Sequence, residues 1–292
     1  MNKISLSKPI AGCMRWGNWG AQFSTAEYRW LIDQLVDQDI TSFDHADIYG
    51  NYTTEADFGT ALRGNSALRK NIQIITKTGI CMPASSNSYI TKHYNNSAEH
   101  IIQSVEKSLR NFHTDYIDVL LIHRPSPLMP PEELAKTIHQ LIKEGKVKSF
   151  GVSNFEAHHI RVLHKHIPIA FNQIEISLLN PKAIFSGILE TCMELNITPM
   201  AWAPLGGGKV TDDSHPRFRA ITKTVEPIAS KYACSMNDIL MAWLYKHPSG
   251  ILPILGSVKP HRLKQAQKAA DIHLSDEEWF CLLEAATGEE IA

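Results

Sequence analysis

Residues 116–122 read Tyr-Ile-Asp-Val-Leu-Leu-Ile, a short run that is apolar almost throughout. Such a run is typical of a strand that is buried on both faces of a parallel sheet. A segment of helical period follows, beginning near Pro130 and Pro131 and ending at Gly145, because proline favours a helix start and glycine a helix end. A second apolar run, Val147–Val152, comes next. The stretch therefore predicts two parallel strands joined by a helix.

The same alternation of short apolar runs and helical segments occupies the rest of the chain. The candidate strands are Pro9–Cys13, Thr41–Asp44, Ile72–Lys77, Tyr116–Ile122, Val147–Val152, Ile169–Ile174, Thr198–Trp202 and Ile251–Leu255. Eight strands separated by helices predict a (β/α)8 TIM barrel rather than an open sheet. Ser275 and Glu278 have the spacing of a capping box and predict an extra C-terminal helix beyond the eighth strand. Because no linker-like stretch interrupts the pattern, we expect residues 1–292 to form a single domain.

Two local features refine this expectation. Asn96 and Glu99 also have capping-box spacing, so a helix is expected to begin at Asn96. The connections at 79–95 and 206–222 are long and polar. Connections of that length in a compact domain are usually functional lids or disordered.

Composition narrows the class of protein. The chain has 292 residues, 43% of them hydrophobic and 20% charged, with a formal net charge of −1. These values are ordinary for a globular protein. The near-neutral charge argues against a nucleic-acid partner. The N-terminus lacks an apolar signal segment, and no run of about 18 apolar residues is present, so we expect a cytoplasmic protein without a membrane partner.

Neither the cysteines nor the histidines suggest a metal site. The cysteines are five in number and scattered, with no Cys-x-x-Cys pair, so neither a zinc ribbon nor a disulfide framework is indicated. The histidines at 158, 159, 164 and 166 cluster without a cysteine or carboxylate to complete a ligand set. A solvated helix face explains them better than a metal.

Four chemically active side chains follow the ends of three candidate strands. Asp44 ends the second strand and Tyr49 follows it, Lys77 ends the third, and His123 follows the fourth. In a (β/α)8 barrel the carboxyl ends of the strands meet at one mouth, where catalytic groups lie. We therefore expect these four side chains to converge.

Their chemistry is coherent. A free phenol has a pKa of about 10 and is a poor proton donor at neutral pH. A neighbouring ammonium, held by a carboxylate, lowers that pKa, so the phenol can protonate a developing alkoxide. An imidazole can orient the carbonyl oxygen. The set lacks an electron source, so a hydride-donating cofactor is implied.

The motifs around these residues resemble the aldo-keto reductase superfamily over the whole chain, and within it the bacterial YdhF-type oxidoreductases. The signature F-D-x-A-x-x-Y-G corresponds to Phe43–Gly50, the strand-three pair to Thr76-Lys77, and the H-R-P motif to His123–Pro125. By this resemblance the catalytic tetrad is Asp44, Tyr49, Lys77 and His123, with Tyr49 as the general acid.

The resemblance also implies a cofactor site. It places the nicotinamide carboxamide on Ser153, Asn154 and Gln173, and the nicotinamide ring against Trp202, where the family usually has tyrosine. The remaining residues that it assigns to the cofactor are Ala203, Leu205, Gly206, Gly256, Ser257, Lys259 and Arg262. Because Lys259 and Arg262 stand where the family binds the adenosine 2′-phosphate, the resemblance implies NADPH rather than NADH.

Several positions depart from the family pattern. His45 replaces a frequent threonine, and Glu55 stands for a glutamate that is displaced by an apparent two-residue insertion. Ala203 replaces a serine beside the pyrophosphate, and Ala266 replaces an asparagine that contacts adenine. These changes bear on cofactor affinity.

The expected function is reduction of a small aldehyde or ketone to an alcohol, with hydride from NADPH and a proton from Tyr49. Two alternatives remain: a barrel that binds NADPH as a sensor with little turnover, and a Schiff-base aldolase that uses Lys77. The aromatic residues Trp16, Trp19 and Tyr89 either pack in the core or line the substrate pocket. Cys81 is expected in an exposed loop. The sequence fixes neither the particular carbonyl nor the oligomeric state.

Overall fold

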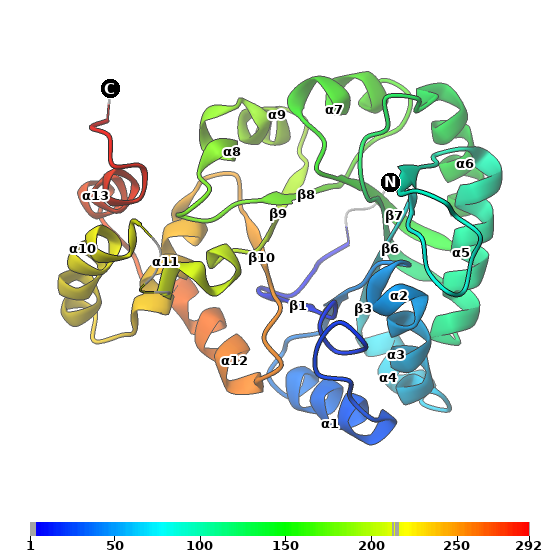
Figure 1. The fold of residues 1–292 in the computed structure, drawn as a ribbon, viewed down its shortest axis with the longest axis horizontal. Coiled ribbons are helices and arrows are strands. Elements are labelled where there is room, and N and C mark those ends of the chain that lie inside the picture. The colour runs from blue at the N-terminus through cyan, green and yellow to red at the C-terminus, as the bar shows by residue number, and fades with distance from the viewer. Residues whose placement is uncertain (1–3, 212, 214–215, 292) are drawn as a thin grey trace.

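The structure is a computed structural model that describes residues 4–211, 213 and 216–291. Its centre is a closed barrel of parallel strands in the order β1-β10-β9-β8-β7-β6-β3-β2 (Figure 1). The strands are β1 (Ile10–Gly12), β2 (Ser42–Asp44), β3 (Gln73–Thr78), β6 (Ile117–Ile122), β7 (Val147–Ser153), β8 (Phe171–Glu175), β9 (Thr198–Trp202) and β10 (Leu252–Leu255). The predicted (β/α)8 barrel is confirmed, and each predicted run contains or overlaps one strand.

Helices surround the barrel on its outer face (Figure 1). The longer ones are α1 (Thr25–Val36), α3 (Thr54–Leu62), α5 (Ala98–Phe112), α6 (Pro131–Lys143), α7 (Ala157–His164), α9 (Ile188–Glu194), α10 (Phe218–Lys231), α11 (Met236–Lys246), α12 (Pro260–Lys268) and α13 (Asp276–Thr287). Shorter helical segments are α2 (Tyr49–Tyr52), α4 (Ser66–Asn71), α8 (Lys182–Phe185) and the 3₁₀ segments Gly206–Thr211 and Ala269–Asp271.

The inside of the barrel is packed with apolar side chains. These are Ile10, Ile75, Val119, Leu121, Phe171, Met200 and Ile254. Gly151 on β7 allows the neighbouring strand β8 to approach closely, since a Cβ at this position would lie 2.6 Å from the backbone oxygen of Phe171. The barrel is therefore a filled core, and a ligand site must lie at one of its ends.

Helix starts agree with the sequence in one case and differ in another. Ser275 and Glu278 form a reciprocal capping box at the start of α13, as predicted. The helix expected from Asn96 begins instead at Ala98, because the Ser97 hydroxyl accepts from the backbone N–H of His100 at 3.4 Å. Asn96 is buried and is not the cap; the N-cap is Ser97, one residue later than predicted.

The C-terminal helix α13 is fastened to α11 by a pair of tryptophans. The rings of Trp243 and Trp279 are stacked, with centroids 5.0 Å apart and planes 8° from parallel. Each indole N–H donates to the backbone oxygen of the other residue, at 3.2 and 3.0 Å. This clasp joins the predicted extra helix to the layer of helices around the barrel.

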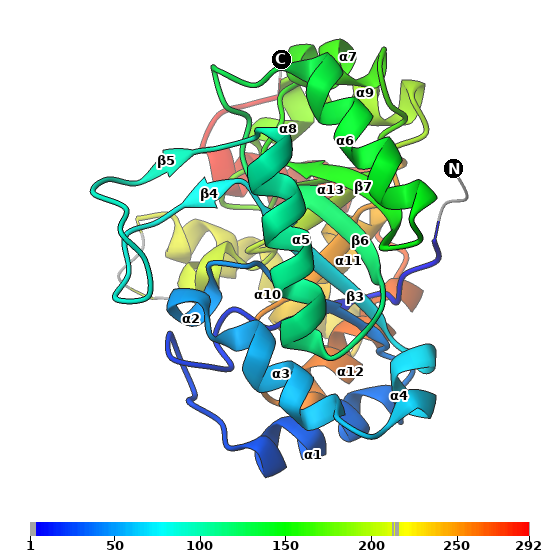
Figure 2. The same ribbon diagram turned by 90° about the vertical axis from the view of Figure 1, so that its right-hand side faces the viewer.

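The two long connections both contain regular secondary structure among their described residues. Segment 79–95 contains a hairpin of β4 (Ile80–Cys81) and β5 (His93–Tyr94), which projects from the body of the molecule (Figure 2). In segment 206–222, a 3₁₀ segment is followed by α10, and residues 212 and 214–215 lie outside the described residues.

The described residues bear on two further expectations, the one about membrane-spanning helices and the one about the cysteines. In this part of the chain, no helix is both long and apolar enough to cross a membrane. The five cysteines are free thiols, which agrees with the expected lack of a disulfide framework.

Candidate active site

Lys77 is at the centre of the polar group at the carboxyl end of the barrel. Its Nζ lies 2.9 and 2.8 Å from the two carboxylate oxygens of Asp44. The same Nζ donates to the His45 backbone oxygen at 2.7 Å and to the Tyr49 hydroxyl oxygen at 3.0 Å. Lys77 is only 1% exposed, so the ammonium exchanges water for four protein acceptors. The structure thus brings together three of the four predicted tetrad residues through one atom.

Strand pairing places Asp44 and Lys77 side by side. Asp44 pairs with Ile75 in the β2–β3 ladder, and the ladder continues past the end of β2 through a bond from the Asp47 N–H to the Lys77 carbonyl oxygen, 3.0 Å long. Both inward-facing side chains therefore meet above the apolar layer. The chain then turns back in α2, which carries Tyr49 over Lys77.

The turn after Tyr49 has an unusual backbone. Gly50, Asn51 and Tyr52 have φ values of 61°, 58° and 71°, all in the left-handed region. Glycine is needed at the first position, since a Cβ there would also lie 2.5 Å from the Thr54 hydroxyl. The indole N–H of Trp19 donates to the Asn51 side-chain oxygen at 3.1 Å and holds the turn from outside.

The pKa of Tyr49 differs from the expectation. Burial raises the pKa of the Tyr49 phenol above its ordinary value, and the nearby Lys77 ammonium offsets only part of that rise. The prediction of a lowered pKa was therefore wrong, because desolvation outweighs a cation that Tyr49 shares with Asp44. The phenol consequently stays protonated at neutral pH, which is the form that a proton donor requires.

Lys77 remains an ammonium. Burial alone would lower the pKa of Lys77, but the charges and hydrogen bonds of Asp44 and Tyr49 raise it above its ordinary value. A nucleophilic amine needs the neutral form, so these contacts oppose the aldolase alternative.

His123 completes the predicted group. Its backbone N–H continues the barrel ladder by donating to the Thr78 carbonyl oxygen at 2.9 Å, and its ring centroid lies 6.2 Å from that of Tyr49. Burial, followed by the charges of Lys77, Arg124 and Lys92, holds the pKa of His123 well below its ordinary value. The imidazole is therefore neutral at neutral pH and has one N–H to donate.

The residues assigned to the nicotinamide end lie together on the next three strands. The Asn154 amide donates to the Ser153 hydroxyl at 2.8 Å and to the His123 carbonyl oxygen at 3.2 Å. The Trp202 indole N–H donates to the Asn154 side-chain oxygen at 3.0 Å. The backbone N–H of Asn154 and the hydroxyl of Ser153 both donate to the Gln173 carbonyl oxygen. One network thus joins β7, β8 and β9.

The side chain of Gln173 makes a contact that the sequence did not predict. Its amide nitrogen donates to Oδ1 of Asp44 at 2.7 Å. The resemblance assigned Gln173 to the cofactor alone, whereas the structure also connects it to the tetrad. No sequence signal marks this contact, because 129 positions separate the two residues.

The residues assigned to the phosphate end surround the start of α12. Lys259 is the residue before the helix, and Arg262 lies in its first turn, both with exposed side chains. The Ser257 hydroxyl accepts from the Lys259 N–H at 3.3 Å, and the preceding Gly256 is exposed. Every residue in the first turn of α12 is described, and none of them is acidic. Cations at a helix N-terminus are unfavourable unless an anion is bound there, so the site fits a phosphate.

Between the two ends lies the segment after β9. Ala203 and Gly206 both adopt left-handed φ values, 50° and 59°, and Leu205 is half-buried between them. A Cβ at Gly206 would lie 2.8 Å from the Leu179 side chain.

A second set of polar residues supports β3 from outside. Glu55 is buried and accepts from the hydroxyl of Thr76 at 2.6 Å, from Ser108 at 3.0 Å and from Asn111 at 3.1 Å. These bonds join α3, which follows the Tyr49 turn, to β3 and α5. Glu55 therefore connects α3 to β3 and α5, although its position in the sequence is displaced from the family pattern.

His45, the substitution next to Asp44, is a core residue. Its ring packs edge-on against Phe58 and Phe112, with centroids 4.4 and 5.1 Å away. Burial, followed by the charge of Lys77, lowers the pKa of His45 to about 3. The side chain is thus neutral and points away from the tetrad.

The three aromatic residues that the sequence left open between core and substrate pocket have different surroundings. Trp16 is fully buried and belongs to the core. Trp19 is partly exposed, and its ring centroid lies 6.0 Å from that of Tyr49. Tyr89, on the β4–β5 hairpin, is also partly exposed. Cys81 is buried, so the expectation that it lies in an exposed loop was wrong.

The histidine cluster has no metal geometry. Nε2 of His158 and Nε2 of His159 lie 3.1 Å apart, but Nδ1 of His159 accepts the Glu156 backbone N–H. The proton of His159 is then on Nε2, where it faces His158. Within the described part of the chain, no group of three or more potential metal-ligating side chains occurs.

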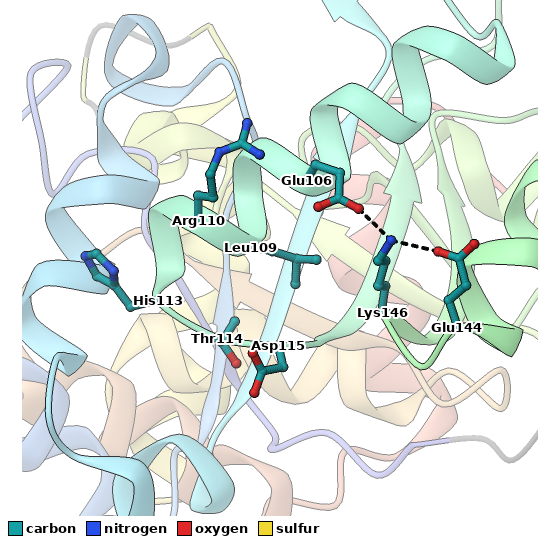
Figure 3. Close-up of a pocket in the computed structure, with 8 residues that line it drawn as sticks. All are labelled: Glu106, Leu109, Arg110, His113, Thr114, Asp115, Glu144 and Lys146. Atoms are coloured by element: carbon teal, nitrogen blue, oxygen red, sulfur yellow. Dashed lines mark hydrogen bonds and ion pairs between the residues drawn. The ribbon is translucent and has the colours of Figure 1, made fainter.

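Surface hollows lie elsewhere on the molecule. One, with a volume of about 750 Å³, is lined by Lys146 and seven other residues near the end of α5 and the starts of β6 and β7 (Figure 3). Lys146 closes ion pairs there with Glu106 and Glu144, 2.6 and 2.7 Å long. This hollow lies at the amino ends of the strands, whereas the tetrad lies at their carboxyl ends.

A filled (β/α)8 barrel with a Tyr–Lys–Asp group and a neutral histidine at its carboxyl end defines the class of barrel oxidoreductases. The sequence model described as the aldo/keto reductase family matches residues 10–285. The chain therefore belongs to the aldo/keto reductase family, an enzyme family of oxidoreductases.

Several relatives resemble the chain over its full length. The oxidoreductase YcsN of Bacillus subtilis is 43% identical over 99% of this chain and 97% of its own. A 6-dehydroglucose reductase of Agrobacterium fabrum is 38% identical over 100% and 98%, and the oxidoreductase YdhF of Escherichia coli is 37% identical over 98% and 95%. The resemblance to YdhF-type oxidoreductases is confirmed.

Solved structures agree on the fold. An aldo/keto reductase of Klebsiella pneumoniae, solved in complex with NADP and acetate, superposes with a TM-score of 0.77 and is 24% identical. The match covers 96% of this chain and 90% of that one. At this level of identity the likeness supports the barrel fold.

Proposed function

We propose that the protein reduces a small aldehyde or ketone to an alcohol, with hydride from NADPH and a proton from Tyr49. The observation that carries this proposal is the contact of 3.0 Å between Lys77 Nζ and the Tyr49 hydroxyl oxygen. Reduction of a carbonyl is the general reaction of the family, and a relative named 6-dehydroglucose reductase is 38% identical.

The direction of that hydrogen bond decides which proton is available. The ammonium of Lys77 can only donate, so the Tyr49 oxygen accepts from it. The hydroxyl proton of Tyr49 is therefore not used in this bond and can be donated to a carbonyl oxygen. As that proton leaves, the cation already in contact stabilises the phenolate that forms.

His123 orients the substrate in this proposal. Its neutral ring, next to Tyr49, can donate one hydrogen bond to the same carbonyl oxygen. Two donors that converge on one oxygen polarise the carbonyl and fix its face. A neutral imidazole serves this purpose without competing with Tyr49 as the acid.

The residues along the mouth of the barrel fit a nicotinamide dinucleotide. Asn154, Ser153 and Gln173 offer amide and hydroxyl groups for a carboxamide, and Trp202 offers an aromatic face. When bound, the dinucleotide supplies the hydride. The residues of the protein hold the dinucleotide in place, orient the carbonyl and donate the proton.

A preference for NADPH is supported by the start of α12. Lys259 and Arg262 place two positive charges at the N-terminal end of the helix. A 2′-phosphate would compensate both, whereas NADH offers only a hydroxyl there. The Klebsiella relative, which was solved with NADP, is consistent with this preference.

The two alternatives are less well supported. A sensor with little turnover has no use for a buried ammonium held at hydrogen-bond distance from a phenol, and this alternative is not favoured. The aldolase requires a neutral Lys77, which the adjacent Asp44 carboxylate opposes.

The test is Tyr49→Phe, assayed by NADPH consumption with a panel of aldehydes, ketones and dicarbonyls. We expect turnover to fall by a factor on the order of 10² to 10⁴, the usual contribution of a positioned acid, with NADPH affinity almost unchanged. Tyr245→Phe is the matched control, because its buried hydroxyl has no hydrogen-bond partner among the described residues. Full activity of Tyr49→Phe would refute the proposal.

A further inference from the structure

The hydrogen bond from Gln173 to Asp44 spans the barrel. Gln173 is on β8 and Asp44 ends β2. In the strand order of the closed barrel, four steps separate β2 from β8 in either direction. The two strands are therefore diametrically opposite, and the 2.7 Å contact joins them across the mouth.

Gln173 is firmly held at its own end. Its side chain is buried, with the residue 3% exposed. Its backbone oxygen accepts from the Asn154 N–H at 2.8 Å and from the Ser153 hydroxyl at 3.0 Å. The amide therefore approaches Asp44 from an anchored strand rather than from a mobile loop.

At the other end, the contact limits how the carboxylate can turn. Oδ1 of Asp44 accepts from both Gln173 and Lys77, whereas Oδ2 accepts from Lys77. Rotation of the carboxylate about its Cβ–Cγ bond would break the Gln173 bond. While that bond is in place, both oxygens face Nζ of Lys77, which in turn donates to Tyr49.

We propose that Gln173 is a positioning residue for the proton donor. Its amide braces Asp44 across the barrel, Asp44 fixes Lys77, and Lys77 fixes and polarises the phenol of Tyr49. This inference rests on the proposed reductase function. It adds to the carboxamide contact a second task for Gln173, which is carried out by its amide nitrogen.

Two substitutions test the brace. Gln173→Met keeps the length of the side chain and removes the donor, so the Asp44–Lys77–Tyr49 chain loses its lateral support. We expect the single-turnover rate of NADPH oxidation to fall on the order of tenfold to a hundredfold, as for other small displacements of catalytic groups. Asn154→Ala is the comparison, because it removes an amide that we assign to the carboxamide, and the side chain of Asn154 bonds to His123, Ser153 and Trp202 rather than to Asp44. The NADPH dissociation constant should rise no more in Gln173→Met than in Asn154→Ala.

Gln173→Glu adds a pH signature that a purely structural role would not produce. It places a second carboxylate at hydrogen-bond distance from Asp44, and two such groups share a proton because they cannot both ionise easily. We expect the single-turnover rate of this variant to acquire a new ionisation between about pH 5 and 8. In Asn154→Asp the introduced carboxylate does not face Asp44 and should titrate near its ordinary pKa, about 4, which leaves this range flat.

The outcomes separate the brace from the reductase proposal. A Gln173→Met rate within twofold of the parent, or a flat Gln173→Glu profile in a folded protein, would overturn the brace even if Tyr49→Phe is inactive. The tenfold loss together with the new ionisation would support it. Full activity of Tyr49→Phe would instead refute the assigned acid, whatever the Gln173 variants do.

Discussion

The ammonium of Lys77 donates to the phenolic oxygen of Tyr49 across 3.0 Å, in a site where both side chains are almost fully buried. The contact has an electrostatic consequence for the whole protein. Burial would lower the pKa of Lys77, and the contacts with Asp44 and Tyr49 raise it, so the proposed chemistry and the stability of the fold both depend on the Asp44–Lys77 ion pair. Mutations can separate the effect of this ion pair on turnover from its effect on stability.

Lys77→Met should remove turnover and also destabilise the fold. The substitution leaves the Asp44 carboxylate buried without its cation, and breaking a buried pair in this way typically costs about 3–5 kcal/mol. Urea unfolding measures the loss. The double variant Asp44→Asn/Lys77→Met should recover much of that stability and remain inactive, since no charge is left unpaired. Equal stability of the single and double variants would contradict this account.

The pH dependence of reduction follows from the two perturbed groups. Because burial raises the pKa of Tyr49, the acid stays protonated and the rate should decline only in the alkaline range. Because burial and Lys77 lower the pKa of His123, its neutral form should persist well below pH 6.5. The single-turnover rate is therefore expected to be level between pH 6 and 8. A decline centred in that interval would assign the proton transfer to another group.

Protein stability should fall in acid through His45. Its pKa is about 3 in the folded protein against 6.5 ordinarily, so below pH 6.5 the unfolded chain binds a proton that the folded chain does not. The stability that this histidine contributes is present above pH 6.5 and is lost as the pH falls, by about 1.4 kcal/mol per pH unit. Urea unfolding at pH 7 and pH 5 should show a smaller difference for His45→Leu than for the parent.

Arg262→Ala should discriminate between the two dinucleotides. Removing a guanidinium that meets the 2′-phosphate weakens NADPH binding much more than NADH binding. Fluorescence titration of both cofactors measures this difference. Arg161→Ala serves as the control, because Arg161 is on α7 in an exposed ion pair with Glu194. Equal losses for both cofactors in Arg262→Ala would show that the phosphate lies elsewhere.

Much of the barrel could be predicted from the sequence because buried parallel strands are apolar on both faces. The run at 116–122 differs from β6 by one residue only. That residues 1–292 form a single domain stays a prediction. The hairpin β4–β5 was missed because its strands are two residues long and one of them is exposed, so neither has a readable period.

The site was predictable where the chain order sets the geometry. Asp44 and Lys77 lie at strand ends and His123 directly follows one, and closure of the barrel brings strand ends to one mouth. The bond between Gln173 and Asp44 was not predictable, because it depends on the barrel diameter and on side-chain reach. The direction of the Tyr49 pKa was also missed, since the degree of burial of the phenol cannot be read from its neighbours in sequence.

The tryptophan clasp between α11 and α13 has an optical consequence. Two indoles 5.0 Å apart and nearly parallel are close enough for their electronic transitions to couple, which gives a paired signal in circular dichroism. That signal would vanish when the C-terminal helix leaves α11, even while the barrel keeps its helical spectrum. The protein thus contains its own reporter for separating detachment of its last helix from unfolding of its catalytic core.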